Sequence, residues 1–160
     1  MIKVGETLPE VTFRTPTSDG PKPLTTSEAF AGKTVALFAV PDAFTPTCSA
    51  KHLPSYLDKA KELEEKGVDA IVCTSVNDAF VMGAWGKDQK TGDKILLLSD
   101  GNGEFAKALG LEMDGSKFGM GSRSKRYSML VKDGVVQKLN VEDPGEYKIS
   151  SAEYLLGQLG

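Results

Sequence analysis

Two near-continuous apolar runs, separated by a stretch with helical periodicity, constrain the fold of this chain most strongly. The runs, residues 34–40 and 69–76, are rich in β-branched side chains, as strands covered on both faces of a sheet are. Between them, apolar residues recur at steps of three and four: Leu53, Tyr56, Leu57, Ala60 and Leu63. Gly67 ends this predicted helix, and Pro54 inside it predicts a kink near residues 50–53. A strand, a helix and a strand at this spacing predict a right-handed parallel crossover.

The rest of the chain predicts a mixed sheet closed by a helix. Shorter segments predict a helix over 79–86, a strand over 95–98 and a helix over 104–109. Residues 127–132 and 135–140 flank Asp133-Gly134, a pair that favours a type I′ turn and therefore an antiparallel hairpin. A helix is predicted over 151–159, and 11–14 is an edge strand or one arm of an N-terminal hairpin. This order predicts an α/β, thioredoxin-like fold with a central mixed sheet flanked by helices.

Length and composition predict one domain over residues 1–160. With 40% apolar and 26% charged residues, such a chain buries roughly two-thirds of its unfolded surface. The net charge is −3 and basic residues are scattered, apart from Arg123, Lys125 and Arg126, so no nucleic-acid partner is expected. No apolar stretch could span a bilayer and the N-terminus lacks a targeting pattern, so we expect no membrane partner and a cytoplasmic location. A mature organellar form whose transit segment was removed would look the same.

The octet Pro41-Asp-Ala-Phe-Thr-Pro-Thr-Cys48, directly after the first apolar run, places a cysteine in the first turn of a helix. Thr45 is the predicted N-cap and Pro46 the first helical residue, which makes Cys48 the third. Free backbone N–H groups and the positive end of the helix dipole meet there and favour the thiolate over the thiol. A cysteine without such neighbours is more often an inert small hydrophobe, so the flanking residues carry the argument.

The pattern Pro-x-x-x-Thr-x-x-Cys, matched by Pro41, Thr45 and Cys48, resembles the peroxidatic loop of the peroxiredoxins. The wider segments AFTPTCSAKHLPSY, VNDAFVMGAWGK, SKRYSMLVKDGVV and LNVE are similar to the fifth, or type II, subfamily over nearly the whole chain. This resemblance implies the same thioredoxin-like fold, a thiol peroxidase acting on hydrogen peroxide and small alkyl hydroperoxides, and a homodimer packed near the active-site loop.

Peroxide reduction needs a thiolate and donors that polarise the O–O bond. We expect Cys48 to be the nucleophile and Thr45 to set its hydroxyl over the sulfur, to cap the helix, or both. By resemblance, Pro41 fences the pocket; otherwise it only terminates the strand. The resemblance also selects Arg126 over Arg123 as the cation that binds the sulfur and the peroxide; a basic residue at a strand start is otherwise usually a solvated charge.

His52 and Cys73 are the other chemistry-bearing side chains near the octet. His52, the only histidine, lies one helical turn after Cys48, where about 6 Å between Cβ atoms suits packing better than proton transfer, so we expect a structural role with at most minor tuning. Cys73 falls in mid-strand, about 10 Å below Cys48, beyond the roughly 7 Å that a disulfide spans. We therefore expect Cys73 to be buried and inert. Nothing completes a metal site, and no cofactor is expected.

The chain also lacks the C-terminal cysteine with which related peroxiredoxins resolve the oxidised thiol. This points to a one-cysteine cycle in which Cys48 becomes a sulfenic acid and an external thiol reduces it, by resemblance glutathione with glutaredoxin, or thioredoxin. Two other classes stay open: a non-catalytic redox sensor or holdase that signals through oxidised Cys48, and a thioredoxin-fold binding module. The family usually has glycine at the position of Asp42, and we expect this added carboxylate to point to solvent.

Overall fold

The computed structural model describes all residues from Met1 to Gly160. The strands are β1 (Thr12–Thr15), β2 (Lys22–Thr25), β3 (Thr34–Ala39), β4 (Ala70–Ser75), β5 (Leu96–Ser99), β6 (Glu112–Asp114), β7 (Ser122–Ser124), β8 (Tyr127–Lys132) and β9 (Val135–Val141). The helices are α1 (Thr26–Phe30), α2 (Leu53–Asp58), α3 (Ala60–Glu65), α4 (Ala79–Gln89), α5 (Glu104–Leu109) and α6 (Ala152–Gln158). A π-helical segment, η1 (Cys48–His52), precedes α2, and a short 3₁₀ turn, η2 (Ser116–Phe118), joins β6 to β7.

Seven strands form one mixed sheet in the order β2-β1-β5-β4-β3-β8-β9, and β6 and β7 pair separately. Strands β3, β4 and β5 are parallel, whereas β8 runs antiparallel to β3 and β9 antiparallel to β8. The predicted parallel crossover is therefore confirmed, with η1, α2 and α3 as its helical part. The predicted hairpin is confirmed as well, because Asp133 and Gly134 both have positive φ, at 49° and 76°.

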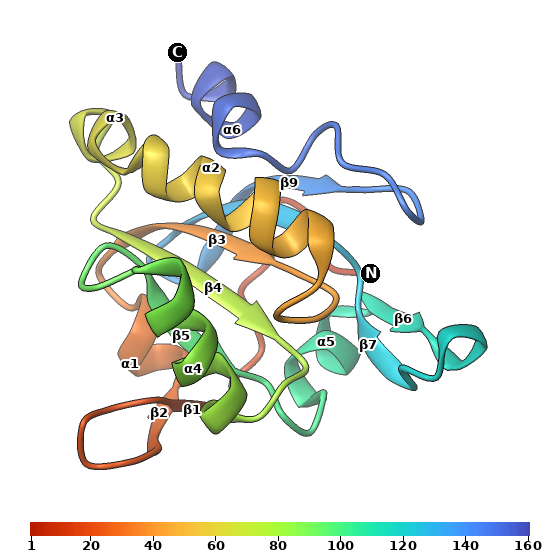
Figure 1. Ribbon diagram of the computed structural model, residues 1–160. Helices are drawn as coiled ribbons and strands as arrows, with labels where there is room; N and C mark the ends of the chain where they lie inside the picture. Colours follow the sequence, from red (N-terminus) through yellow and green to blue (C-terminus); the bar gives the residue numbers. More distant parts are fainter.

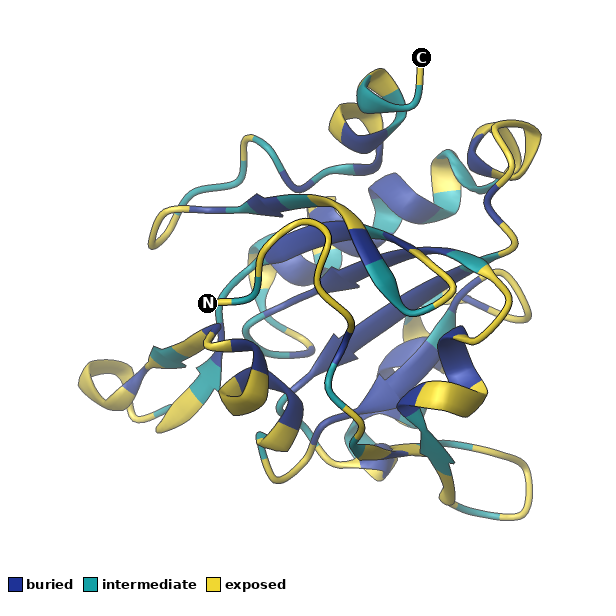
Figure 2. Ribbon diagram, turned by 180° about the vertical axis from the view of Figure 1, so that it is seen from behind, coloured by how far each residue is buried: buried dark blue, intermediate teal, exposed yellow.

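Helices cover both faces of the sheet, and each face has its own core (Figure 1). Helices α2, α3, α4 and α6 contribute to the first core, which contains both Cys48 and Cys73. Helices α1 and α5 contribute to the second. Figure 2 shows the central strands as buried, while the β6–β7 hairpin and most connecting loops are exposed. This is the thioredoxin-like arrangement that the sequence predicts.

The helices α1 to α4 differ from the prediction. The helix α1 follows a capping box in which Thr25 and Glu28 satisfy each other's backbone N–H groups. The helix predicted as continuous from Leu53 to Leu63 is divided at Lys59, whose φ and ψ of −103° and 8° lie outside the helical range. Helix α4 runs to Gln89, past the predicted end at Gly86.

Candidate active site

The loop after β3 delivers Cys48 to the start of a helix, as predicted. The backbone N–H of Val40 still bonds to Thr74 of β4, and the helical turn begins at Pro46 with the Ser49 N–H donating to the Thr45 carbonyl at 2.9 Å. Cys48 is the third residue of that turn, and its side chain is fully buried at the end of the parallel strands. The thiol is thus held near free N–H groups and away from bulk water.

The predicted kink is a π-turn. The Leu53 N–H donates to the carbonyl of Cys48, five residues back, instead of four. Pro54 has no N–H to give to Ala50, so the regular helical ladder is interrupted there. From Leu53 onward the chain resumes an α-helix, with proline in its first turn.

Arg126 meets the sulfur of Cys48 from the connection just before β8. It precedes β8, whose first residue Tyr127 lies opposite Ala39 at the end of β3. Its Nη2 donates to Cys48 Sγ at 3.2 Å and its Nη1 donates to His52 Nδ1 at 2.9 Å. No carboxylate forms an ion pair with Arg126. The guanidinium therefore donates to the sulfur and to one neutral acceptor, the His52 ring.

His52 supports Arg126, a link that the sequence analysis missed. The ring is fully buried, and Nε2 lies 3.0 Å from the carbonyl of Ser150. Because a carbonyl can only accept, Nε2 carries the proton and Nδ1 presents its lone pair to the arginine. Burial, together with the charge of Arg126, lowers the pKa of His52 from 6.5 to about 3. A residue expected to be structural thus fixes the arginine that contacts the thiol.

Thr45 and Pro41 both lie in the loop that leads to Cys48. The Thr45 hydroxyl donates its proton to the carbonyl of Asp42 at 2.6 Å, not to the sulfur, and so closes the loop on itself. Pro41 lines a hollow of about 150 Å³ together with Thr47 and Arg126. The structure therefore brings all four predicted site residues to one end of the sheet.

The expectation that Asp42 points to solvent is wrong. Its side chain is only 22% exposed and its Oδ1 accepts from Asn77 Nδ2 at 2.6 Å and from Arg123 Nη1 at 3.4 Å. Arg123, over which the resemblance selects Arg126, also donates to the carbonyls of Val76 and Met120. A carboxylate in this half-buried position needs such donors, because leaving it unpaired would cost several kcal/mol. No sequence spacing connects residues 42, 77 and 123.

Cys73 is buried in mid-strand, as predicted. It lies opposite Phe38 of β3 and both cysteines are free. Burial, with a further effect of nearby Cys48, raises the pKa of the Cys73 thiol well above its usual value. A thiol in that state is a poor nucleophile.

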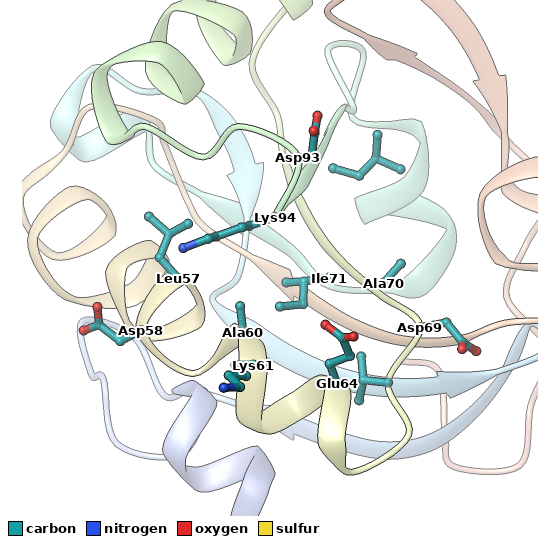
Figure 3. A pocket seen from close by; sticks show the side chains of 12 residues that line it. Leu57, Asp58, Ala60, Lys61, Glu64, Asp69, Ala70, Ile71, Asp93 and Lys94 are labelled. Carbon is teal, nitrogen blue, oxygen red and sulfur yellow. The ribbon is translucent and has the colours of Figure 1, made fainter.

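Two larger hollows lie away from this site. One, of about 510 Å³, is lined by α2, α3 and the starts of β4 and β5, with Asp58, Lys61, Glu64 and Lys94 around it (Figure 3). The other, of about 860 Å³, lies between the β1–β2 connection and α4. Neither includes Pro41 or Arg126, and none of the three hollows is lined by Cys48 or Thr45. No helix is long and apolar enough to cross a membrane, and no cluster of three or more acidic, histidine or cysteine side chains could hold a metal ion.

Comparison with known proteins agrees with this geometry. The profile of the Redoxin family matches residues 3–156. Peroxiredoxin-2E, chloroplastic, of Arabidopsis thaliana is 52% identical over 99% of this chain and 69% of its own length, and Peroxiredoxin-2D of the same plant is 44% identical over 99% and 98%. A crystal structure of reduced Prx3 in complex with H₂O₂ from Vibrio vulnificus superposes with a TM-score of 0.96 at 52% identity, covering 100% of both chains. With the match extending over nearly every residue, the chain belongs to the redoxin family and is a type II peroxiredoxin, a thiol-dependent peroxidase.

Proposed function

We propose that Cys48 is the peroxidatic nucleophile and becomes a sulfenic acid in each cycle. The thiolate attacks one peroxide oxygen, an S–O bond forms as the O–O bond breaks, and the departing alkoxide or hydroxide takes up a proton. The sulfur is thereby oxidised and the peroxide reduced. The observation that carries this proposal is the 3.2 Å contact between Arg126 Nη2 and Cys48 Sγ.

Arg126, Thr45 and Pro41 have separate roles in the proposal. The forked guanidinium binds the sulfur and stabilises the negative charge on the departing oxygen. The Thr45 hydroxyl, anchored on Asp42, fixes the loop and offers its lone pairs to a peroxide O–H. Pro41 and Arg126 line a hollow of about 150 Å³ that does not include Cys48 itself; in this proposal it is the approach for hydrogen peroxide and small alkyl hydroperoxides.

An external thiol, either glutathione with glutaredoxin or thioredoxin, returns the sulfenic acid to the thiol. The burial of Cys73 within β4 supports a one-cysteine cycle, because burial raises the pKa of its thiol and a protonated thiol is a poor nucleophile toward the oxidised sulfur. We also place the chain in the cytoplasm, where such reductants keep thiols reduced.

A homodimer is part of the same proposal. Phe44 in the active-site loop is 51% exposed with a positive φ of 64°, and Phe80 at the start of α4 is 74% exposed. The two segments are joined by the hydrogen bond from the Ala43 N–H to Asn77 Oδ1. Large exposed aromatic side chains on joined segments are typical of a protein–protein interface. Analytical ultracentrifugation of Phe80→Ser should show a smaller species than the unchanged protein.

Steady-state turnover of hydrogen peroxide with each candidate reductant tests the function. Trp85, the only tryptophan, donates to Ser49 Oγ at 3.0 Å, so its fluorescence should report oxidation of the adjacent Cys48. We expect fast stopped-flow oxidation followed by recovery with at least one reductant system. Oxidation without recovery in any system would favour the redox sensor or holdase instead.

A further inference from the structure

A single carboxylate fastens the segment that follows β9. Oε2 of Glu142 accepts from three successive backbone N–H groups, those of Lys148 at 2.7 Å, Ile149 at 2.8 Å and Ser150 at 2.9 Å. It accepts from the Ser150 hydroxyl as well, at 2.7 Å. We call residues 143–150 the strap. Glu142 is 6% exposed, so this carboxylate draws its solvation almost entirely from the strap.

The fastened strap reaches the thiol through two further side chains. The carbonyl of Ser150 accepts from His52 Nε2 and from the Tyr56 hydroxyl, each at 3.0 Å. The other ring nitrogen of His52 then accepts from Arg126, which contacts Cys48. Every link in this series is a hydrogen bond between buried or half-buried groups, so water competes little for these contacts. The position of Ser150 therefore influences the position of Arg126.

The strap also covers Arg126 directly. The Tyr147 ring centre lies 5.8 Å from the guanidinium carbon and 5.3 Å from the His52 ring centre. The Glu142 backbone N–H donates to the Arg126 carbonyl at 2.9 Å, which places the residue that holds the strap beside the arginine it covers. Burial raises the pKa of Glu142, but the hydrogen bonds from Ser150, Ile149 and Lys148 outweigh it and lower the pKa overall. The carboxylate therefore remains charged at neutral pH.

We propose that Glu142 is a positioning residue for the peroxidase reaction, which acts by fixing the Ser150 carbonyl that orients His52 and, through it, Arg126 on Cys48. This inference rests on the proposed role of Cys48. Without the carboxylate, the strap N–H groups are released, His52 loses its fixed acceptor, and the guanidinium is no longer held against the sulfur. Misplacement of a catalytic group by about 1 Å can cost about 100-fold in rate.

The test compares Glu142→Ala and Glu142→Gln with Asp100→Ala and Asp100→Asn. Asp100 is a matched control because its buried carboxylate also accepts from two successive backbone N–H groups, those of Phe105 and Ala106, but at the start of α5. Two quantities are measured on folded protein: the pH midpoint of thiolate formation at Cys48, from absorbance at 240 nm in a Cys73→Ser background, and the second-order rate constant for hydrogen peroxide.

We expect Glu142→Ala to raise the midpoint by about one pH unit and to lower the rate constant by about tenfold or more. Glu142→Gln, which keeps an oxygen acceptor, should change both in the same direction by less. The Asp100 variants should lower stability but leave the thiolate midpoint within about 0.3 pH units, and the rate constant within about twofold, of the unchanged protein.

An unchanged midpoint and rate in Glu142→Ala, or equal changes in Asp100→Ala, would overturn the proposal. If Glu142→Ala does not fold, Glu142→Gln decides in the same way against Asp100→Asn. The thiolate titration needs no turnover, so a failed proposal for Glu142 is distinguishable from a failed proposal for Cys48, which Cys48→Ser tests separately.

Discussion

The Nδ1 atom of His52 accepts a hydrogen bond from Arg126 Nη1 at 2.9 Å, so the only histidine of the chain serves the arginine and not the thiol. A protonated His52 would have no lone pair for Arg126 and would put two cations side by side. The buried ring is therefore neutral in the folded protein, with consequences for the pH dependence of stability.

Acid should destabilise the fold first through His52. Its pKa is about 3 in the folded protein and 6.5 in an unfolded chain, so between these values only the unfolded chain binds the proton. The contribution of His52 to the free energy of unfolding should be complete above pH 6.5. It should fall by about 1.4 kcal/mol per pH unit as the pH drops below that value. Urea denaturation between pH 7 and pH 5, a window above the range in which carboxylates titrate, measures this slope. In His52→Gln the slope should disappear; the same slope in both proteins would refute the assignment.

The two cysteines should behave oppositely in a peroxide assay. Cys48→Ser should abolish hydroperoxide consumption, because a hydroxyl at that position is not ionised and cannot replace the thiolate. Cys73→Ser should keep the rate within about threefold, since Cys73 lies in mid-strand and Arg126 donates its hydrogen bond to Cys48 instead. Equal activity in the two variants would contradict the role of Cys48.

Arg126→Lys should lower the second-order rate constant for hydrogen peroxide by between about 10-fold and 100-fold. An ammonium group cannot donate at once to Cys48 and His52 in the planar arrangement of a guanidinium. Arg123→Lys is the matched variant, because Arg123 bonds to Asp42 and to two carbonyls but not to the sulfur. Stopped-flow fluorescence of Trp85 measures both, and a loss in Arg123→Lys as large as in Arg126→Lys would argue against a direct role of Arg126.

Asp42→Gly should lower the free energy of unfolding by about 1 to 2 kcal/mol, since Asn77 and Arg123 lose an acceptor and the loop gains freedom. The peroxidase rate should change by less than about tenfold, because the carboxylate points away from the sulfur toward these donors. Asp42→Asn, which keeps an acceptor, should be intermediate in stability between the unchanged protein and Asp42→Gly. Thermal denaturation and the peroxide assay measure these effects, and a gain in rate above tenfold would mean that the acid restrains the site.

The parallel crossover, the Asp133-Gly134 hairpin and the helical start at Cys48 could be predicted because each depends on residues close together in sequence. Apolar periodicity, a type I′ turn pair and a proline at the first helical position all leave local patterns. The β6–β7 hairpin left none, since its strands are three residues long and mostly exposed.

The supporting contacts of the site could not be predicted for the opposite reason. Asp42 is 35 and 81 residues away in sequence from its partners Asn77 and Arg123, and His52 is 74 residues away from Arg126. Such pairs are fixed by sheet register and by helix placement, which become known only with the whole fold. His52 did offer one signal: a lone histidine on the buried face of a helix needs polar partners for both ring nitrogens.

The π-turn at Cys48–His52 sets the number of residues between the thiol and the helix α2. Each residue turns an α-helix by about 100°, so the chain between the thiol and Pro54 is longer by one peptide than a regular helix would require. A deletion of one residue in 49–51 would remove the wide turn and shorten the spacing between Cys48 and His52, which both contact Arg126. The number of residues from the thiol to the histidine is therefore part of the site, and any redesign of the loop has to keep it.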